Sequence, residues 1–159
     1  MRSKTAIPRA RRNQDRLTGT RRMAAATLLA LVFATPAAAQ VEGFKTPSNN
    51  IFCILEAPFE AGRESDLRCD IMQMQARPAR RPRSCPLEWG DAFTITEHGN
   101  SAERLCHGDT ARNDELMPLS YGTEWQHGAF TCRSEASGVT CANVERHGFT
   151  LSRSTQKLF

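Results

Sequence analysis

The sequence predicts an all-β fold: a small antiparallel domain of β-hairpins, sandwich-like or barrel-like, stapled by three disulfides. Three observations lead to this prediction. Turn signals recur roughly every eight to twelve residues after residue 40, and no amphipathic period of helical length appears. The chain has six cysteines, an even number, and all of them follow residue 50. Gly128–Phe149 has the pattern of a hairpin with one cysteine in each strand.

That hairpin is the clearest local pattern. Two β-rich runs, Ala129–Arg133 and Val139–Val144, flank a Ser-Glu-Ala-Ser-Gly turn. A hairpin centred on Ala136/Ser137 puts Cys132 opposite Cys141. Opposed residues of a hairpin can approach to the ~4.4–6.8 Å between Cα atoms that a disulfide requires.

Residues 1–39 have the features of a secretory signal peptide. Arginines are frequent before the short apolar run Met23–Thr35, and the small residues Pro36-Ala37-Ala38-Ala39 follow it. The apolar run is too short for a transmembrane helix. We therefore expect cleavage after Ala39, a single disulfide-stabilised β domain over residues 40–159 with no integral membrane segment, and a periplasmic or extracellular location.

The charge of the predicted mature chain argues against nucleic-acid binding. The whole chain has 21 lysines and arginines and 17 acidic residues, of which eight and one, respectively, lie in residues 1–39. The remainder has 13 basic and 16 acidic residues, a net charge of −3. A mildly acidic domain lacks the positive surface that phosphate binding requires.

The cysteine spacing favours structural disulfides over a metal or redox site. No C-x-x-C motif occurs, so we expect neither a metal ion nor a cofactor. Six cysteines allow fifteen connectivities. Pairing between neighbours is favoured because each pair closes a loop of hairpin size, and this pairing would join Cys53 to Cys69, Cys85 to Cys106, and Cys132 to Cys141.

The first half of the domain begins with an extended segment, Val41–Ser48, in which Phe44 is expected to anchor. Strands are expected at Ile51–Leu55 and Leu67–Met72, with the hairpin centred near Ala61. This strand, cysteine, turn, cysteine, strand order is the construction seen again in the last hairpin.

The next stretch, residues 73–85, is an arginine- and proline-rich connector. Prolines exclude both helix and regular strand here, so we expect an extended surface segment. It is either a solvated linker or a patch that faces anions such as acidic lipid headgroups or glycan phosphates. The arginines involved are Arg77, Arg80, Arg81 and Arg83.

Further strands are expected at Ala92–Thr96 and, after a turn at His98-Gly99-Asn100, at Ser101–Cys106. Arg112–Met117 is expected to form one helical turn before Pro118. Phe149–Arg153 is expected to be the last strand, followed by a tail over Ser154–Phe159.

Few residues suggest chemistry. All four histidines precede a glycine, which indicates turns in which glycine supplies a positive φ; alternatively, several of these turns converge into a metal or acid–base site. A bond between Cys85 and Cys106 would bring Asp91 and Asp109 near each other as a carboxylate pair for acid–base work; the alternative, which the Gly-Asp-Thr context favours, is that they cap turns. The possible ligand-binding residues are Asp91, Asp109, His107, His147, Trp89 and Trp125, and no residue is assigned as catalytic.

Several motifs together resemble a family of small exported bacterial domains of unknown function, over about Phe44–Phe159. They are F-x-T-P-S-x-N-I-x-C from Phe44, L-R-C-D-I from Leu67, W-G-D from Trp89, C-x-G-D-T from Cys106, Y-G-x-x-W from Tyr121, S-G-V-T-C-x-N from Ser137 and H-G-F-x-L-S-R from His147. The chain departs from the pattern at Asn49 and Arg146, where glycine is expected. The resemblance implies a secreted disulfide-containing domain and no known activity.

We therefore expect a non-enzymatic binding or interaction module of the cell envelope, with an unidentified protein or envelope glycan as partner. A secreted hydrolase inhibitor, acting through Arg80, Arg81 or Asp109, is the alternative. A small enzyme that uses Asp91, Asp109 and a histidine is a third hypothesis.

Overall fold

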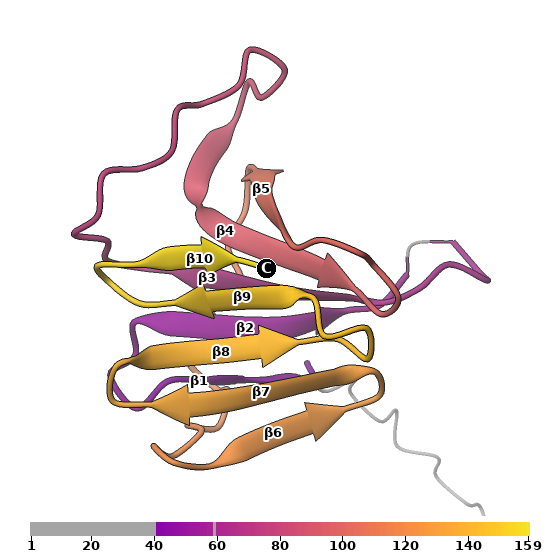
Figure 1. Ribbon diagram of the computed structural model, residues 1–159, viewed down its shortest axis with the longest axis vertical. Coiled ribbons are helices and arrows are strands. Elements are labelled where there is room, and N and C mark those ends of the chain that lie inside the picture. The colour runs from indigo at the N-terminus through magenta and orange to yellow at the C-terminus, as the bar shows by residue number, and fades with distance from the viewer. Residues whose placement is uncertain (1–40, 59) are drawn as a thin grey trace, which may run out of the picture. The chain divides into compact units, whose positions relative to one another are not determined.

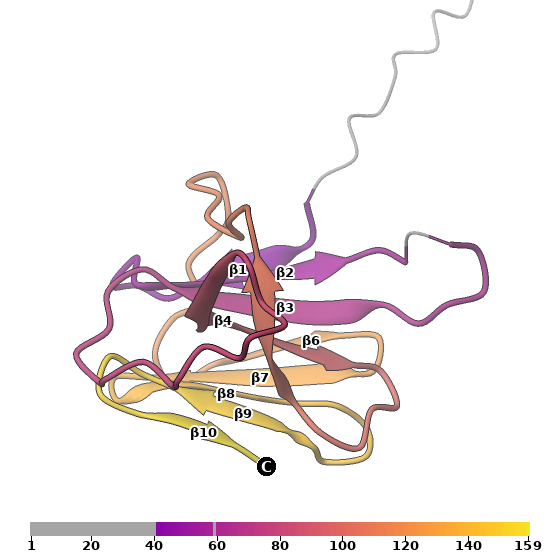
Figure 2. The same cartoon turned by 90° about the horizontal axis from the view of Figure 1, so that it is seen from above.

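The computed structural model describes residues 41–58 and 60–159, and the predicted signal peptide lies outside them. Within these residues every regular element is a strand, and the strands form two five-stranded antiparallel sheets (Figures 1 and 2). The predicted all-β class is confirmed, and the arrangement is sandwich-like, because neither sheet closes into a barrel. No helix in the described part of the chain is long and apolar enough to cross a membrane.

Each sheet is a simple meander. The first runs in the order β1-β2-β3-β4-β5, and the second in the order β10-β9-β8-β7-β6. The strands of the first sheet are β1 Gly43–Lys45, β2 Ile51–Glu56, β3 Asp66–Ile71, β4 Glu88–Thr96 and β5 Glu103–His107. Those of the second are β6 Glu124–His127, β7 Phe130–Glu135, β8 Gly138–Ala142, β9 Gly148–Leu151 and β10 Gln156–Leu158.

All three disulfides join neighbouring cysteines, as predicted. Cys53 of β2 lies opposite Cys69 of β3, and Cys132 of β7 lies opposite Cys141 of β8. The β2–β3 and β7–β8 hairpins are therefore centred as predicted, near Ala61 and at Ala136/Ser137. In the loop-entropy model each bridge contributes about 2–4 kcal/mol.

The two sheets repeat one construction. In each, an aromatic residue, two bonded cysteines and a second aromatic residue form a row of directly paired residues across four strands. The rows are Phe44, Cys53, Cys69 and Phe93 in β1–β4, and Trp125, Cys132, Cys141 and Phe149 in β6–β9. Strands β1 to β4 thus correspond in order to β6 to β9. The likeness that the sequence showed between the two disulfide hairpins, β2–β3 and β7–β8, therefore extends to the strands on either side of them.

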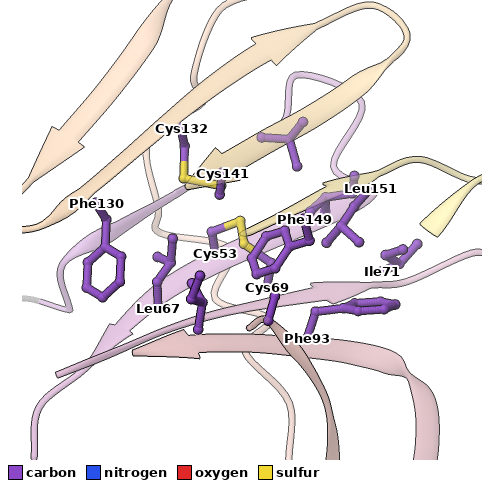
Figure 3. Packing of buried hydrophobic residues seen from close by; sticks show 14 of the residues in the cluster. Cys53, Leu67, Cys69, Ile71, Phe93, Phe130, Cys132, Cys141, Phe149 and Leu151 are labelled. Atoms are coloured by element: carbon purple, nitrogen blue, oxygen red, sulfur yellow. A yellow bond between two sulfur atoms is a disulfide. The ribbon is translucent and has the colours of Figure 1, made fainter. Parts of the chain in front are cut away.

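These rows face each other and form the core (Figure 3). The ring centroids lie 5.3 Å apart for Phe44 and Trp125, and 6.2 Å apart for Phe93 and Phe149. Between the two aromatic pairs, the sulfur atoms of Cys53, Cys69 and Cys141 lie within 4.8 Å of one another. The disulfides are thus packing elements of the core as well as crosslinks.

The core and the crosslinks are complete within one compact unit. That unit spans Ala38–Phe159, and the buried cluster and the three disulfides all lie inside it. A unit with its own hydrophobic core satisfies the main requirement for independent folding.

The outer face of the first sheet is covered by the segment that follows β5. Phe52 of β2 points away from the main core and is buried with Ala111 and Leu116 in a second apolar cluster. The same segment also extends the edge of the sheet at β1. The backbone amide of Lys45 donates to the Met117 carbonyl, and the backbone amide of Leu119 donates to the Lys45 carbonyl. This cover positions the charged residues described below.

Three local predictions were wrong. Arg112–Met117 does not form a helical turn but an irregular segment containing a turn closed by Leu116 N and Asn113 O. The tail after the predicted last strand contains β10, since its backbone can pair with the free edge of β9. Of the four glycines that follow histidines, only Gly128 has a positive φ.

The positive φ values of Asn49 and Arg146 were not predicted. These are the non-glycine residues with positive φ in the described chain, at 52° and 65°. Both are the positions at which the resemblance leads one to expect glycine.

Candidate functional site

A buried ion cluster lies on the outer face of β3. Because side chains alternate along a strand, Leu67, Cys69 and Ile71 enter the core while Arg68 and Asp70 face outward. The side chains of Arg68 and Asp70 are only 3% and 2% exposed. Arg68 donates to both carboxylate oxygens of Asp70, from Nε at 2.9 Å and from Nη2 at 3.0 Å.

The segment after β5 completes this cluster. Arg68 also donates from Nη1 to Asp109 Oδ1 at 2.7 Å and from Nη2 to the Asp109 carbonyl at 3.1 Å. Asp70 Oδ2 accepts a hydrogen bond from the Ala111 backbone at 2.7 Å. Glu56 adds a carboxylate 3.3 Å from Nη1. The cluster therefore fastens residues 109–111 onto the sheet.

The pKa shifts follow from these contacts. Burial lowers the pKa of Arg68, and the hydrogen bonds to Asp70 and Asp109 more than offset this, so its pKa is raised. The Arg68 hydrogen bond lowers the pKa of Asp109. Both groups are charged throughout the physiological range.

His107, at the end of β5, has both ring nitrogens engaged. Nε2 lies 3.0 Å from Asp91 Oδ1, and Nδ1 lies 2.6 Å from the Asp109 carbonyl. A carbonyl and a carboxylate are acceptors, so these contacts favour the imidazolium form of the ring, in which both nitrogens donate. Burial lowers the pKa of His107, but the hydrogen bonds to Asp91 and Asp109 outweigh it, and the pKa is raised.

A β-bulge places Asp91 against this ring. The register between β4 and β5 shifts between Trp89 and Phe93, and Gly90 has a φ of 109°. Such bulges redirect a side chain locally. The Trp89-Gly90-Asp91 motif carried a signal for the bulge, since a glycine inside a strand often marks one.

The predicted carboxylate pair therefore does not form. The structure brings together Asp91, His107 and Asp109, but Asp91 binds the imidazolium whereas the Asp109 carboxylate binds Arg68. In the imidazolium form, neither nitrogen of His107 has a lone pair free to accept a proton. Sequence reasoning missed Arg68 and Asp70; the signal was their opposite charge two residues apart on one face of a strand.

The other histidines lie apart from this cluster. The His147 backbone donates to Asn143 Oδ1, His98 contacts Glu64 at 3.0 Å, and the His127 ring stacks on Trp125. Among the described residues, these three histidines share no hydrogen bond or ion pair with one another or with His107, and no group of histidines is placed to hold a metal ion.

A polar cleft lies where turns from both sheets meet, with a volume of about 370 Å³. Its walls come from the β1–β2 and β7–β8 turns, from the β9–β10 turn and from Tyr121. Within the described residues, the side chains of Tyr121, Ser137 and Arg153 make no hydrogen bond or ion pair. The remaining lining is also mostly polar: Thr46, Ser48, Asn50, Glu135, Ser152 and Ser154.

With this geometry in place, the chain can be compared with known proteins. The model of a family of unknown function, DUF6636, matches residues 24–159. The chain belongs to DUF6636. No curated protein and no solved structure matches it. The resemblance to a family of unknown function is confirmed at that level.

The two tryptophans of this DUF6636 domain are half-buried and do not share a site. Trp89 pairs with Cys106 in the β4–β5 ladder, and its buried Nε1 has no hydrogen-bond partner in the described structure. Trp125 lies between Phe44 and His127, whose ring is nearly parallel to it, with centroids 5.7 Å apart. Trp125 therefore belongs to the end of the core, whereas Trp89 lies beside the bulge.

Proposed function

We propose that this DUF6636 domain is an exported, non-enzymatic module that binds a partner at the cell envelope. The supporting observation is a contrast between two places in the molecule. The histidine and carboxylates that would do acid–base chemistry are engaged in internal hydrogen bonds, whereas the side chains of Tyr121, Ser137 and Arg153 in the cleft have none among the described residues. An arrangement of this kind favours binding over catalysis.

Export is supported by the disulfides. Three bridges, two of them packed in the core, require an oxidising compartment to form and persist. The basic and apolar pattern of residues 1–39 supports the same proposal.

The cleft favours a glycan as ligand. Tyr121 is 48% exposed and offers an aromatic face, while Arg153 and the surrounding hydroxyls offer directional hydrogen bonds. Polar groups that converge on one aromatic surface suit a hydroxyl-rich ligand, and the cleft volume falls within the range of ligand sites, roughly 300–1,000 Å³.

This proposal is tested with residues 38–159 and immobilised envelope glycan fractions. We expect retention by the unaltered domain and at least a tenfold loss of affinity for Tyr121→Ala and for Arg153→Ala, since each removes a direct contact. Met117→Ala is the control, because Met117 is exposed but does not line the cleft. Retention that is equal in all variants would refute the cleft as the site.

A second candidate is a secreted hydrolase inhibitor. It is favoured by the connector 73–85, which leaves the sheets between β3 and β4 and presents Arg80 and Arg81 to solvent (Figure 1). A fixed, exposed loop loses little entropy when it docks into an enzyme cleft. Stoichiometric inhibition of an arginine-specific protease, abolished by Arg80→Ala/Arg81→Ala, would support it; no inhibition would remove it.

A further inference from the structure

The connector carries the least compensated positive charge in the described domain. Arg77, Arg80, Arg81 and Arg83 are all exposed, and none of them forms an ion pair with a described acidic residue. Among the other exposed arginines of the described chain, Arg63, Arg112 and Arg133 each lie within 4.0 Å of a glutamate or aspartate, whereas Arg146 and Arg153 are single unpaired charges outside the connector. The connector arginines are therefore available to a partner.

The connector is held at both ends. Near its start, the backbone amides of Gln75 and Ala76 donate to the Arg153 carbonyl at 2.7 and 3.1 Å. At its end, Cys85 is bonded to Cys106 of β5. Pro78 and Pro82 restrict the chain between these points. The four arginines are consequently presented on a restrained segment, which lowers the entropy lost on binding.

The rest of the domain has the opposite charge. After residue 39 the chain has 13 basic and 16 acidic residues, and the connector contains four of the former and none of the latter. The remainder therefore has nine basic and 16 acidic residues. This asymmetry orients the domain in an electric field with the connector toward negative charge. Acidic groups more than about 10 Å from the contact are largely screened by salt.

An exposed apolar side chain follows the arginines closely in the sequence. Leu87, two residues after Cys85, is 48% exposed. Basic side chains beside an apolar one match the chemistry of a lipid headgroup region, in which charge attracts and the apolar group inserts. A soluble polyanion would give Leu87 nothing to bind.

We propose that the connector 73–85, together with Leu87, binds an anionic phospholipid surface. The contact is peripheral: the arginines bind headgroup phosphates, and Leu87 enters the interface. The start of the connector is bonded to the backbone of Arg153, which lines the cleft, but the four arginines and Leu87 do not line it. The contact therefore adds to the proposed function and does not depend on the glycan.

The test is flotation of residues 38–159 with vesicles of phosphatidylcholine that contain phosphatidylglycerol, and with vesicles of phosphatidylcholine alone. We expect binding to the anionic vesicles only, weakened by added salt. The variant Arg77→Gln/Arg80→Gln/Arg81→Gln should lose roughly 100-fold in partitioning, since each arginine at an anionic surface contributes about fivefold.

The matched control is Arg63→Gln/Arg112→Gln/Arg133→Gln, which removes the same charge from ion-paired positions and should change partitioning little. Leu87→Ser should reduce the binding that survives high salt. Absence of flotation by the unaltered domain, or equal losses in the two triple variants, would overturn the inference. The inference would also be overturned if the domain bound soluble polyphosphate as tightly as vesicles and Leu87→Ser had no effect. Inhibition of a protease without any flotation would overturn it as well. Glycan retention by the Arg77/Arg80/Arg81 variant would show in each case that the cleft proposal still stands.

Discussion

Arg68 and Asp70 lie two residues apart on one strand, and the guanidinium donates to both oxygens of the carboxylate at 2.9 and 3.0 Å. Both side chains are almost fully buried beneath residues 109–111. An ion pair that is removed from water in this way is sensitive to the loss of one member, because the other charge remains buried.

We predict that Asp70→Ala destabilises the domain by roughly 3–5 kcal/mol, since it leaves Arg68 buried without its bidentate partner and frees the Ala111 amide. Urea denaturation measures this change. The control is Asp114→Ala, which breaks the exposed contact with Arg112 and should cost about 0–1 kcal/mol. Similar losses for both variants would contradict the structural role of the cluster.

We predict a pH-dependent contribution from His107. Its pKa is raised in the folded protein, because its hydrogen bonds to Asp91 and Asp109 outweigh the opposing effect of burial. The contribution to stability is therefore fully present below the unfolded pKa of about 6.5, and it is lost as pH rises through the higher folded pKa.

The measurement compares the free energy of unfolding of the unaltered domain and of His107→Gln at several pH values from 5 to about 9. The difference between them should shrink as the pH rises above about 6.5. His98→Gln, at an exposed histidine beside Glu64, is the control for a surface position. A difference that stays constant with pH, or grows as pH rises, would show that the ring is not an imidazolium.

The three disulfides should differ in their effect on stability, although their loops have similar entropy. Loop closure predicts about 3 kcal/mol for each. Cys53, Cys69, Cys132 and Cys141 are completely buried, so replacing either core pair by alanine also loses packing. Cys85→Ala/Cys106→Ala lies outside the main core cluster and should cost less.

Urea midpoints of the three double variants should therefore place the Cys85/Cys106 variant nearest to the unaltered domain. The ranking is informative because this bridge closes the longest loop, with a separation of 21 residues against 16 and 9. If entropy alone decided the result, the Cys85/Cys106 variant would instead be the least stable.

We predict that Gly148→Ala prevents correct pairing of β8 and β9. A Cβ at this position would overlap the carbonyl oxygen of Cys141, which is backbone and cannot move aside. The expected result is a loss of several kcal/mol, or failure to fold. Gly108→Ala is the matched control, since it also follows a histidine, has no positive φ, and its Cβ would meet only Leu87 at 3.5 Å. Equal stability of the two variants would contradict the predicted register at Gly148.

Much of the local structure was predictable because it depends on short-range patterns. The centres of both disulfide hairpins, the buried position of Phe44 and the neighbour pairing of the cysteines follow from spacing along the chain. The positive φ at Asn49 and Arg146 was not predicted, although both residues stand where the resemblance leads one to expect glycine. β10 was missed because its three residues gain a partner only when β9 presents a free edge.

The candidate site was only partly predictable, for a related reason. Asp91, His107 and Asp109 could be named as polar residues beside a disulfide, but their partners could not. Arg68 comes from β3, 41 residues before Asp109, and meets it only when the segment after β5 folds over the sheet. The bulge at Gly90 then decides that Asp91 reaches His107 instead of a second carboxylate.

By itself, the sequence determined the two disulfide hairpins, most of the strands and the three crosslinks, because alternation, turn chemistry and cysteine spacing act over a few residues. Only the tertiary structure decided which charges neutralise one another and which remain free for a partner. The physical reason is that burial and ion pairing depend on distances between segments remote in the chain. Because of those distances, both ring nitrogens of His107 are occupied by hydrogen bonds within the domain, whereas the connector arginines remain exposed.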